Sequence, residues 1–242
     1  MPSLSALRVK LFADGADLAV IRQMASDPHI QGFTTNPTLM RKAGVEDYVA
    51  FSHEVLRVIG DRPISFEVFS DDFAEMEAQA RAIASWGPNV FVKIPITNTF
   101  GQSSAPLVAR LAAAAVQVNV TAILTDAQVA QIADALSPTV PSFVSVFAGR
   151  IADTGIDPVP VIARSLTLLR KLPRAEVIWA SPRELLNVFQ ADAVGCHVIT
   201  ATADVLKKLS LVGKDLTAYS LDTVEMFRRD AVAAGYTIPV VI

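Results

Sequence analysis

One lysine in this 242-residue chain stands where a charged side chain is unexpected. Lys93 lies within the run Val90–Ile96, which otherwise has the pattern of a buried strand. Burial or neighbouring cations lower the pKa of a lysine from its ordinary value of about 10.4, and the neutral amine then attacks carbonyl groups. The alternative is an ammonium that reaches solvent at the strand end or pairs with a buried carboxylate.

Two carboxylates follow similar strand-like runs. Asp14 ends the first such run and Glu67 lies in the third. Carboxylates beside an amine that forms a Schiff base can move the protons of carbinolamine formation, dehydration and C–C cleavage. The alternatives are structural: Asp14 caps a helix, although Asp17 suits that role better, and Glu67 forms an ion pair in the core, with Lys93 as a candidate partner.

Two arginines are candidates for binding an anionic group of a substrate. Arg150 and Arg183 follow the sixth and seventh strand-like runs, and Ser145 and Ser181 could add hydroxyl donors. A guanidinium group binds phosphate oxygens in a bidentate manner. The alternative is that both arginines form ordinary salt bridges at the surface.

Other kinds of centre lack their motifs. His29, His53 and His197 are scattered, no HxH or CxxC spacing occurs, and there is no glycine-rich phosphate loop. The single cysteine, Cys196, lies in an apolar stretch and is interpreted as a core residue. The sequence therefore predicts neither a metal site nor a loop for phosphoryl transfer.

Composition limits the partners and the location. Apolar residues make up 52% and charged residues 19%, and the net charge of −3 argues against binding nucleic acid or an anionic membrane. The first eleven residues do not resemble a signal peptide, and the most apolar region, Leu107–Leu124, is interrupted by polar side chains. We expect a soluble, cytoplasmic protein, and one cysteine fits a reducing compartment.

Eight short strand-like runs alternate with helical periodicity along the chain, as a single (β/α)8 (TIM) barrel of the α/β class requires. The predicted strands are Arg8–Ala13, Gly32–Thr35, Ile64–Val68, Val90–Ile94, Asn119–Ile123, Phe143–Phe147, Glu176–Ala180 and His197–Ile199. An open doubly wound sheet is the alternative, but no glycine-rich dinucleotide fingerprint follows the first strand. One domain spanning residues 1–242 is expected.

Helices are predicted between these strands and after the last of them. Their ranges are Asp17–Ser26, Val45–Ile59, Asp71–Trp86, Ser104–Ala115, Asp126–Leu136, Pro158–Lys171, Pro182–Gln190, Thr202–Leu209 and Leu221–Ala234. Asp71 and Asp126 are interpreted as caps, and Pro158 and Pro182 as residues of a first helical turn. The apolar tail Tyr236–Ile242 is expected to pack on its own barrel or, with the last helix (about 216–242), on a neighbouring subunit.

The barrel explains why these polar residues are so far apart in the sequence. Active sites of such barrels lie at the carboxyl ends of the strands, where distant segments converge. The residues expected there are Asp14, Thr34, Thr35, Asn36, Glu67, Lys93, Asn119, Thr121, Ser145, Arg150, Ser181 and Arg183.

Several of these segments together resemble the transaldolase family, including its short members related to fructose-6-phosphate aldolase. The segments are Leu11–Asp17, Gly32–Thr38, Ser65–Val68, Val92–Thr97, Asn119–Thr121, Ser145–Ile151 and Ala180–Arg183. They occur in the family's order from about residue 11 to residue 209. The Thr-Thr-Asn-Pro and Lys-Ile-Pro motifs are specific in combination, although each is weak alone.

The resemblance implies a role for each matching residue. Lys93 would form a Schiff base with a ketose phosphate, and Asp14 would be the acid and base of C–C cleavage. Glu67 and Thr121 would hold a catalytic water. The substrate would be bound by Thr35, Asn36, Asn119, Ser145, Phe147, Arg150, Ser181 and Arg183. The resemblance also implies a homo-oligomer of undetermined size, sugar phosphate substrates and no cofactor.

Two positions bear on the branch of the family. Glu67 and Phe147 match the transaldolases, whereas the aldolase members tend to carry glutamine and tyrosine there. Pro182 departs from the aromatic residue usual in the family, so a transaldolase of a specialised sugar pathway with a different acceptor is an alternative.

Two further functions are compatible with the same barrel. One is a lyase that releases dihydroxyacetone from fructose 6-phosphate. The second is a barrel without catalysis that serves binding or assembly, and the retention of Lys93, Asp14, Glu67 and Thr121 together argues against it.

Overall fold

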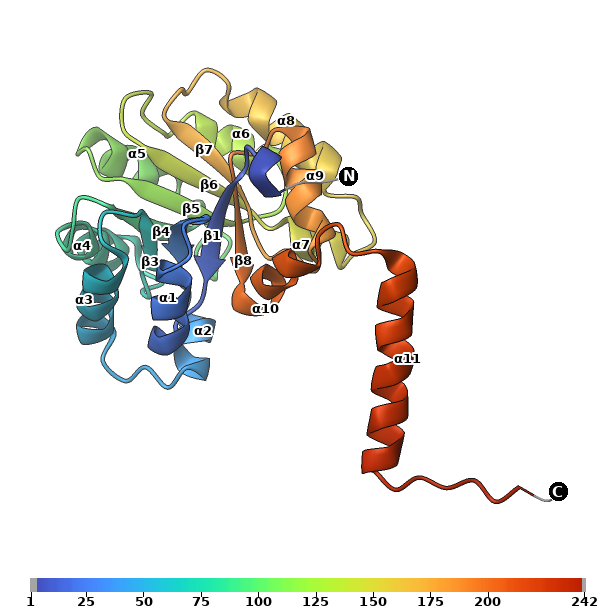
Figure 1. The fold of residues 1–242 in the computed structure, drawn as a ribbon. Coiled ribbons are helices and arrows are strands. Elements are labelled where there is room, and N and C mark those ends of the chain that lie inside the picture. Colours follow the sequence, from blue (N-terminus) through green and yellow to red (C-terminus); the bar gives the residue numbers. More distant parts are fainter. Residues whose placement is uncertain (1–3, 241–242) are drawn as a thin grey trace.

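The computed structural model describes residues 4–240 and confirms a closed (β/α)8 barrel (Figure 1). All eight strands are parallel and pair in sequence order, with β8 returning to β1. The strands are β1 (Lys10–Asp14), β2 (Ile30–Thr34), β3 (Ile64–Glu67), β4 (Val90–Pro95), β5 (Val118–Ile123), β6 (Ser142–Val146), β7 (Ala175–Trp179) and β8 (Val198–Thr202).

Helices cover the outside of the barrel (Figure 1). Each strand is followed by a helical segment that returns the chain along the outside to the start of the next parallel strand. The α-helices are α1 (Leu18–Ala25), α2 (Pro37–Lys42), α3 (Tyr48–Ile59), α4 (Phe73–Ala84), α5 (Ala105–Ala113), α6 (Asp126–Ala133), α7 (Ala148–Ala152), α8 (Val159–Leu169), α9 (Leu186–Val194), α10 (Ala203–Leu206) and α11 (Leu216–Ala233). Two 3-10 helices, η1 (Leu4–Ala6) and η2 (Lys207–Leu211), flank the barrel in sequence.

Alternate residues of each strand face the inside of the barrel, as the period of two requires. The ring of Phe143 on β6 contacts those of Phe12 on β1 and Phe91 on β4, at centroid distances of 5.6 and 4.2 Å. These strands are not neighbours, so the rings meet across the interior. Ile178 and Val198 belong to the same small cluster.

The next inward positions, nearer the carboxyl ends of the strands, carry polar side chains. They include Asp14, Thr34, Glu67, Lys93, Asn119, Ser145 and Thr200. A separate, larger apolar core lies between the barrel and the helices. These polar side chains form a layer, here named the polar chamber, next to the aromatic layer or floor of the barrel, and such layered filling is typical of this fold.

Several predicted boundaries were wrong for local reasons. The cap of α4 is Asp72, whose side chain accepts the backbone N–H groups of Ala74 and Glu75, and Asp71 instead accepts from Thr99. Thr125 caps α6 through a reciprocal pair with Gln128, so Asp126 is already inside the helix. Asp17 caps α1 as expected.

Some segments were shifted or missed. Helix α9 begins at Leu186, so Pro182 lies in the preceding loop, and Pro158 is the residue before α8. The short helices α2 and α7 were not predicted. Helix α11 begins at Leu216, five residues before the predicted start, with Asp215 as its cap.

Helix α11 leads away from the barrel (Figure 1). None of its residues is buried, and Leu216, Leu221, Val224 and Phe227 are more than half exposed. The described part of the tail is also exposed, with Ile238 at 86%. The expectation that the tail packs on its own barrel was therefore wrong for residues 236–240, and residues 241 and 242 lie outside the described part.

Across residues 4–240, no helix combines the length and the apolar character that crossing a membrane requires.

Candidate active site

Lys93 lies at the centre of the polar chamber. Its residue is 6% exposed, and its Nζ atom donates a hydrogen bond of 3.0 Å to the backbone oxygen of Thr35. The side chain enters from β4 because it has the same inward parity as Phe91, two residues earlier. The sequence-based alternative of an ammonium that reaches solvent was therefore wrong.

Glu67 is the ion partner of Lys93. An Oε atom of Glu67 lies 3.2 Å from Nζ of Lys93, and the two residues are paired on the adjacent strands β3 and β4. Both side chains are largely shielded from solvent. The core ion pair expected on structural grounds thus exists, and it also puts a carboxylate beside the candidate nucleophile.

Asp14 provides a second carboxylate from β1. Burial raises the pKa of this carboxyl above its ordinary value, although the nearby Lys93 and a hydrogen bond from Thr34 both act to lower it. The Thr34 hydroxyl donates to Asp14 Oδ1 at 2.8 Å. Because Asp17 caps α1, the carboxylate of Asp14 is not required there.

Asn119 is held by two hydroxyls. Its Nδ2 atom donates to Ser65 Oγ at 2.9 Å, and its Oδ1 atom accepts from Ser145 Oγ at 2.7 Å. All three residues are buried in the chamber. Ser65 was not singled out from the sequence, because a serine inside a strand gives no signal of its partner.

Thr121 has a buried hydroxyl with no hydrogen-bond partner among the residues that the structure describes. It lies on β5, where it pairs with Pro95 of β4, two residues after Lys93. A buried hydroxyl without a partner costs about 1–3 kcal/mol. Such a group requires a partner other than these side chains, such as water or a ligand.

The two arginines are exposed and differ in their contacts. Arg183 forms a forked ion pair with Asp153, in which Nε lies 2.9 Å from Oδ1. This pairing lowers the pKa of Asp153 and raises that of Arg183. Arg150 lies over the ring of Phe147, 5.6 Å from its centroid. The surface salt bridge considered for both arginines thus occurs at Arg183.

Gly149 allows the two arginine-bearing segments to approach each other. A Cβ atom at Gly149 would lie 1.5 Å from the backbone oxygen of Ser181. Ser181 itself has a φ of +57°, which is uncommon for a residue with a side chain. The loop after β7 is therefore packed tightly against the start of α7.

The remaining candidates have structural contacts as well. Asn36 is the N-cap of α2, where its Oδ1 atom accepts the backbone N–H of Leu39. The Thr35 hydroxyl donates to the backbone oxygen of Ser65, and Phe147 packs on the interior aromatic cluster. These contacts fix the position of each residue and leave its role toward a ligand open.

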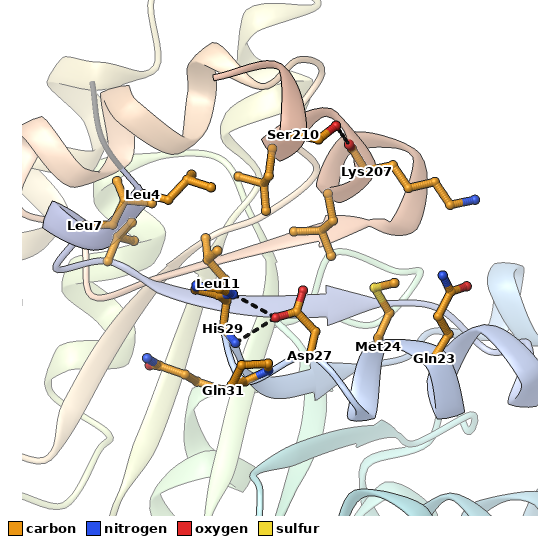
Figure 2. A pocket seen from close by; sticks show the side chains of 14 residues that line it. Leu4, Leu7, Leu11, Gln23, Met24, Asp27, His29, Gln31, Lys207 and Ser210 are labelled. Atoms are coloured by element: carbon orange, nitrogen blue, oxygen red, sulfur yellow. Dashed lines mark hydrogen bonds and ion pairs between the residues drawn. The ribbon is translucent and has the colours of Figure 1, made fainter. Parts of the chain in front are cut away.

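A cavity of about 500 Å³, whose lining side chains are drawn in Figure 2, includes none of the residues of this chamber. Its lining comes from η1, the start of β1, the end of α1, the start of β2 and η2, with Leu11 and Met24 among the apolar residues. Leu11 belongs to the outer core and not to the barrel interior. This cavity is therefore separate from Lys93.

A family model for transaldolase/fructose-6-phosphate aldolase matches residues 11–238. The chain belongs to this family. The family's members are transaldolase-type enzymes that act on sugar phosphates.

Individual relatives agree. The chain is 33% identical over 231 residues to a protein named probable transaldolase from Thermoanaerobacter sp. (strain X514), covering 95% of this chain and all of the relative. It is 32% identical over 202 residues to a probable transaldolase from Dehalococcoides mccartyi (strain ATCC BAA-2266 / KCTC 15142 / 195), covering 83% and 90%. A solved mandelate oxidase variant shares the fold, with a TM-score of 0.58 at 15% identity over 96% of this chain and 80% of that one.

Proposed function

We propose that this member of the family is a transaldolase. It moves a dihydroxyacetone unit from a ketose phosphate, sedoheptulose 7-phosphate or fructose 6-phosphate, to an aldose phosphate, through a Schiff base on Lys93. The observation that carries the proposal is the burial of Lys93 beside Glu67 and close to Asp14. We place the reaction in the pentose phosphate pathway and in the cytoplasm.

In this proposal Lys93 supplies the covalent step. Its ammonium first gives a proton to the neighbouring Glu67, the amine adds to the C2 carbonyl of the ketose, and loss of water gives an iminium that accepts electrons. Asp14 removes the proton of the C4 hydroxyl, the C3–C4 bond breaks, and the aldose leaves. The three-carbon enamine on Lys93 then attacks the aldehyde of the acceptor, Asp14 returns its proton to the new C4 oxygen, and hydrolysis of the resulting iminium releases the new ketose. No cofactor is required because the iminium is the electron sink.

Glu67 and Thr121 serve the dehydration and hydrolysis steps. Glu67 lies 3.2 Å from Nζ of Lys93, and the buried Thr121 hydroxyl has no partner in residues 4–240. A water held between them satisfies that hydroxyl and can carry protons to and from the carbinolamine oxygen. Asn36, Asn119, Thr35 and Ser145 bind the donor's hydroxyl groups.

Arg150, Arg183 and Ser181 bind the phosphate group. Arg183 is engaged by Asp153 in the structure, and both side chains of that pair are about half exposed. Solvent screens an exposed pair of this kind, so a dianionic phosphate can displace the carboxylate. Pro182, which stands between Ser181 and Arg183, shapes this pocket.

Transfer and simple cleavage are distinguished by the need for an acceptor. Dihydroxyacetone released from fructose 6-phosphate is measured with and without erythrose 4-phosphate. A transaldolase forms sedoheptulose 7-phosphate when the acceptor is present and releases little free dihydroxyacetone. Equal release of free dihydroxyacetone in both assays favours the lyase, and an acceptor other than erythrose 4-phosphate favours a specialised pathway.

Phe147→Tyr tests why transfer is favoured. Phe147 packs at the edge of the interior aromatic cluster and has no hydroxyl to protonate the enamine. A tyrosine at this position provides a proton donor, so release of dihydroxyacetone from fructose 6-phosphate should rise by about tenfold or more. The measurement is free dihydroxyacetone without an acceptor, and an unchanged rate removes this argument.

We also propose a homo-oligomer in which α11 and the tail pack on a neighbouring copy. The large exposed apolar side chains of α11 support this arrangement, because apolar side chains gathered on an exposed surface favour association with another protein surface. Phe227→Ser should lower the mass measured by light scattering at micromolar concentration. Arg229→Ser on the same helix is the control and should leave it unchanged. A monomeric parent protein would contradict the proposal.

A further inference from the structure

A hydrogen-bonded chain of two threonines leads to Asp14 from the neighbouring strands. Thr34 on β2 is paired with Asp14, and Thr200 on β8 is paired with Phe12, one inward position below Asp14. The hydroxyl oxygens of Thr34 and Thr200 lie 2.6 Å apart, and both residues are buried. The two side chains therefore meet across β1, between the aromatic floor and the carboxylate.

The direction of this chain follows from the number of protons available. A hydroxyl has one proton to donate and two lone pairs that accept. Thr34 uses its proton in the 2.8 Å bond to Asp14 Oδ1 when the carboxyl is ionised. Thr200 must then donate to Thr34, and no other hydrogen bond of the Thr200 hydroxyl occurs among residues 4–240. Both donors consequently point toward the carboxylate.

We propose that Thr200 is a positioning residue, which acts through Thr34 to hold the carboxylate of Asp14 ionised and oriented toward the bond that breaks. Thr200 does not reach the reacting atoms itself. A donor that is itself hydrogen-bonded by a second donor is polarised and binds an anion more strongly. This inference rests on the proposed function, because it assigns Thr200 a part in the proton transfer that Asp14 performs.

Few charged groups other than Lys93 lie close enough to Asp14 to influence the ionisation of its carboxyl group. Lys93 on β4 faces Asp14 and favours its ionised form, and Lys93 is itself paired with Glu67 on β3. The inward groups of β5 and β6 near Lys93 are the uncharged Asn119, Thr121 and Ser145. Lys10 and Glu176 pair with each other below the aromatic floor, at 2.6 Å, and Arg150 and Arg183 are exposed beyond the ends of β6 and β7.

The test compares Thr200→Val with Thr200→Ser in the full-length protein. Valine keeps the shape and removes the hydroxyl, so the ionised form of Asp14 loses support. We expect kcat for transfer to fall about tenfold with KM within about twofold, and the acidic limb of the kcat profile to move up by about half a pH unit or more. Serine keeps the hydroxyl and should restore most of kcat and the position of the limb.

Thr167→Val is the matched control, since Thr167 lies on α8 outside the barrel and its hydroxyl also makes one hydrogen bond, to the backbone oxygen of Ala163. It should leave the profile unchanged. The proposal is overturned by a Thr200→Val profile that matches the parent, or by a Thr200→Ser variant as impaired as Thr200→Val, which would mean that only the methyl group matters. If Thr200→Val does not fold, as judged by circular dichroism, Thr200→Ala replaces it in the same comparison.

Reductive trapping of a donor on Lys93 separates this inference from the proposed function. If the parent protein traps no donor, the proposed function fails and Thr200 has no such role. If the parent traps the donor and Thr200→Val behaves as the parent does, only the role of Thr200 is rejected.

Discussion

Replacing Lys93 by methionine is expected to lower kcat/KM for transfer from fructose 6-phosphate to erythrose 4-phosphate by about four orders of magnitude or more. The methionine side chain occupies a similar volume and has no nucleophile, so the iminium cannot form. The rate is measured as production of sedoheptulose 7-phosphate. The variant also leaves Glu67 without its ion partner, and we therefore expect a lower melting temperature.

Lys10→Met is the matched control for this experiment. Lys10 also pairs with a glutamate at a barrel strand, in a 2.6 Å ion pair with Glu176, but it lies below the aromatic floor and away from the chamber. Its replacement should change stability while leaving kcat/KM within a fewfold of the parent. Substantial transfer by Lys93→Met, or an equal loss in Lys10→Met, would contradict the assignment of the nucleophile.

Asp14→Asn should have the second largest effect, a fall in kcat of about 10²–10⁴ with a much smaller change in KM. Asparagine keeps the size of the side chain and cannot take the proton of the C4 hydroxyl. Binding of the donor and its trapping on Lys93 should persist, because the amine is unchanged. Asp17→Asn, at the nearby cap of α1, is the control and should retain activity. A kcat close to that of the parent would reject Asp14 as the base.

The pKa of Asp14 also predicts how stability responds to this substitution. Burial raises the pKa of Asp14 in the folded protein, so the folded state binds this proton more tightly than the unfolded state does. The stabilising contribution is therefore present below the unfolded pKa and is lost as the pH rises through the folded pKa. At neutral pH the ionised carboxyl disfavours folding, and Asp14→Asn should have a higher melting temperature than the parent, with a difference that shrinks in acid.

The strands were predictable because helices cover one face of the sheet and side chains fill the barrel on the other. This double burial gives apolar runs such as Val90–Ile94, in which one lysine is conspicuous. Helices α2 and α7 were missed because they are short and their sequences contain loop-forming residues. Asn36 is an example: the sequence placed it at the end of a strand, and it did not reveal that its side chain also caps α2.

The residues that form the site could be predicted from the sequence more easily than the contacts between them. The sequence allowed the pairing of Lys93 with Glu67, since charged residues on adjacent strands at the same level are natural partners. Thr200 gave no signal, because threonine is common in strands for its branched side chain. Only the register of β8 against β1 brings its hydroxyl to Thr34. Likewise, no pattern in the sequence indicates that α11 leads away from the barrel.

Reduction with borohydride in the presence of fructose 6-phosphate, followed by peptide mass spectrometry, tests the central claim most directly. The buried amine of Lys93 should carry a stable adduct with the mass of the reduced three-carbon unit or of the reduced donor, and Lys93→Met should carry none. A parent protein that remains unmodified at Lys93, or that is labelled on Lys10 instead, would contradict the Schiff-base account.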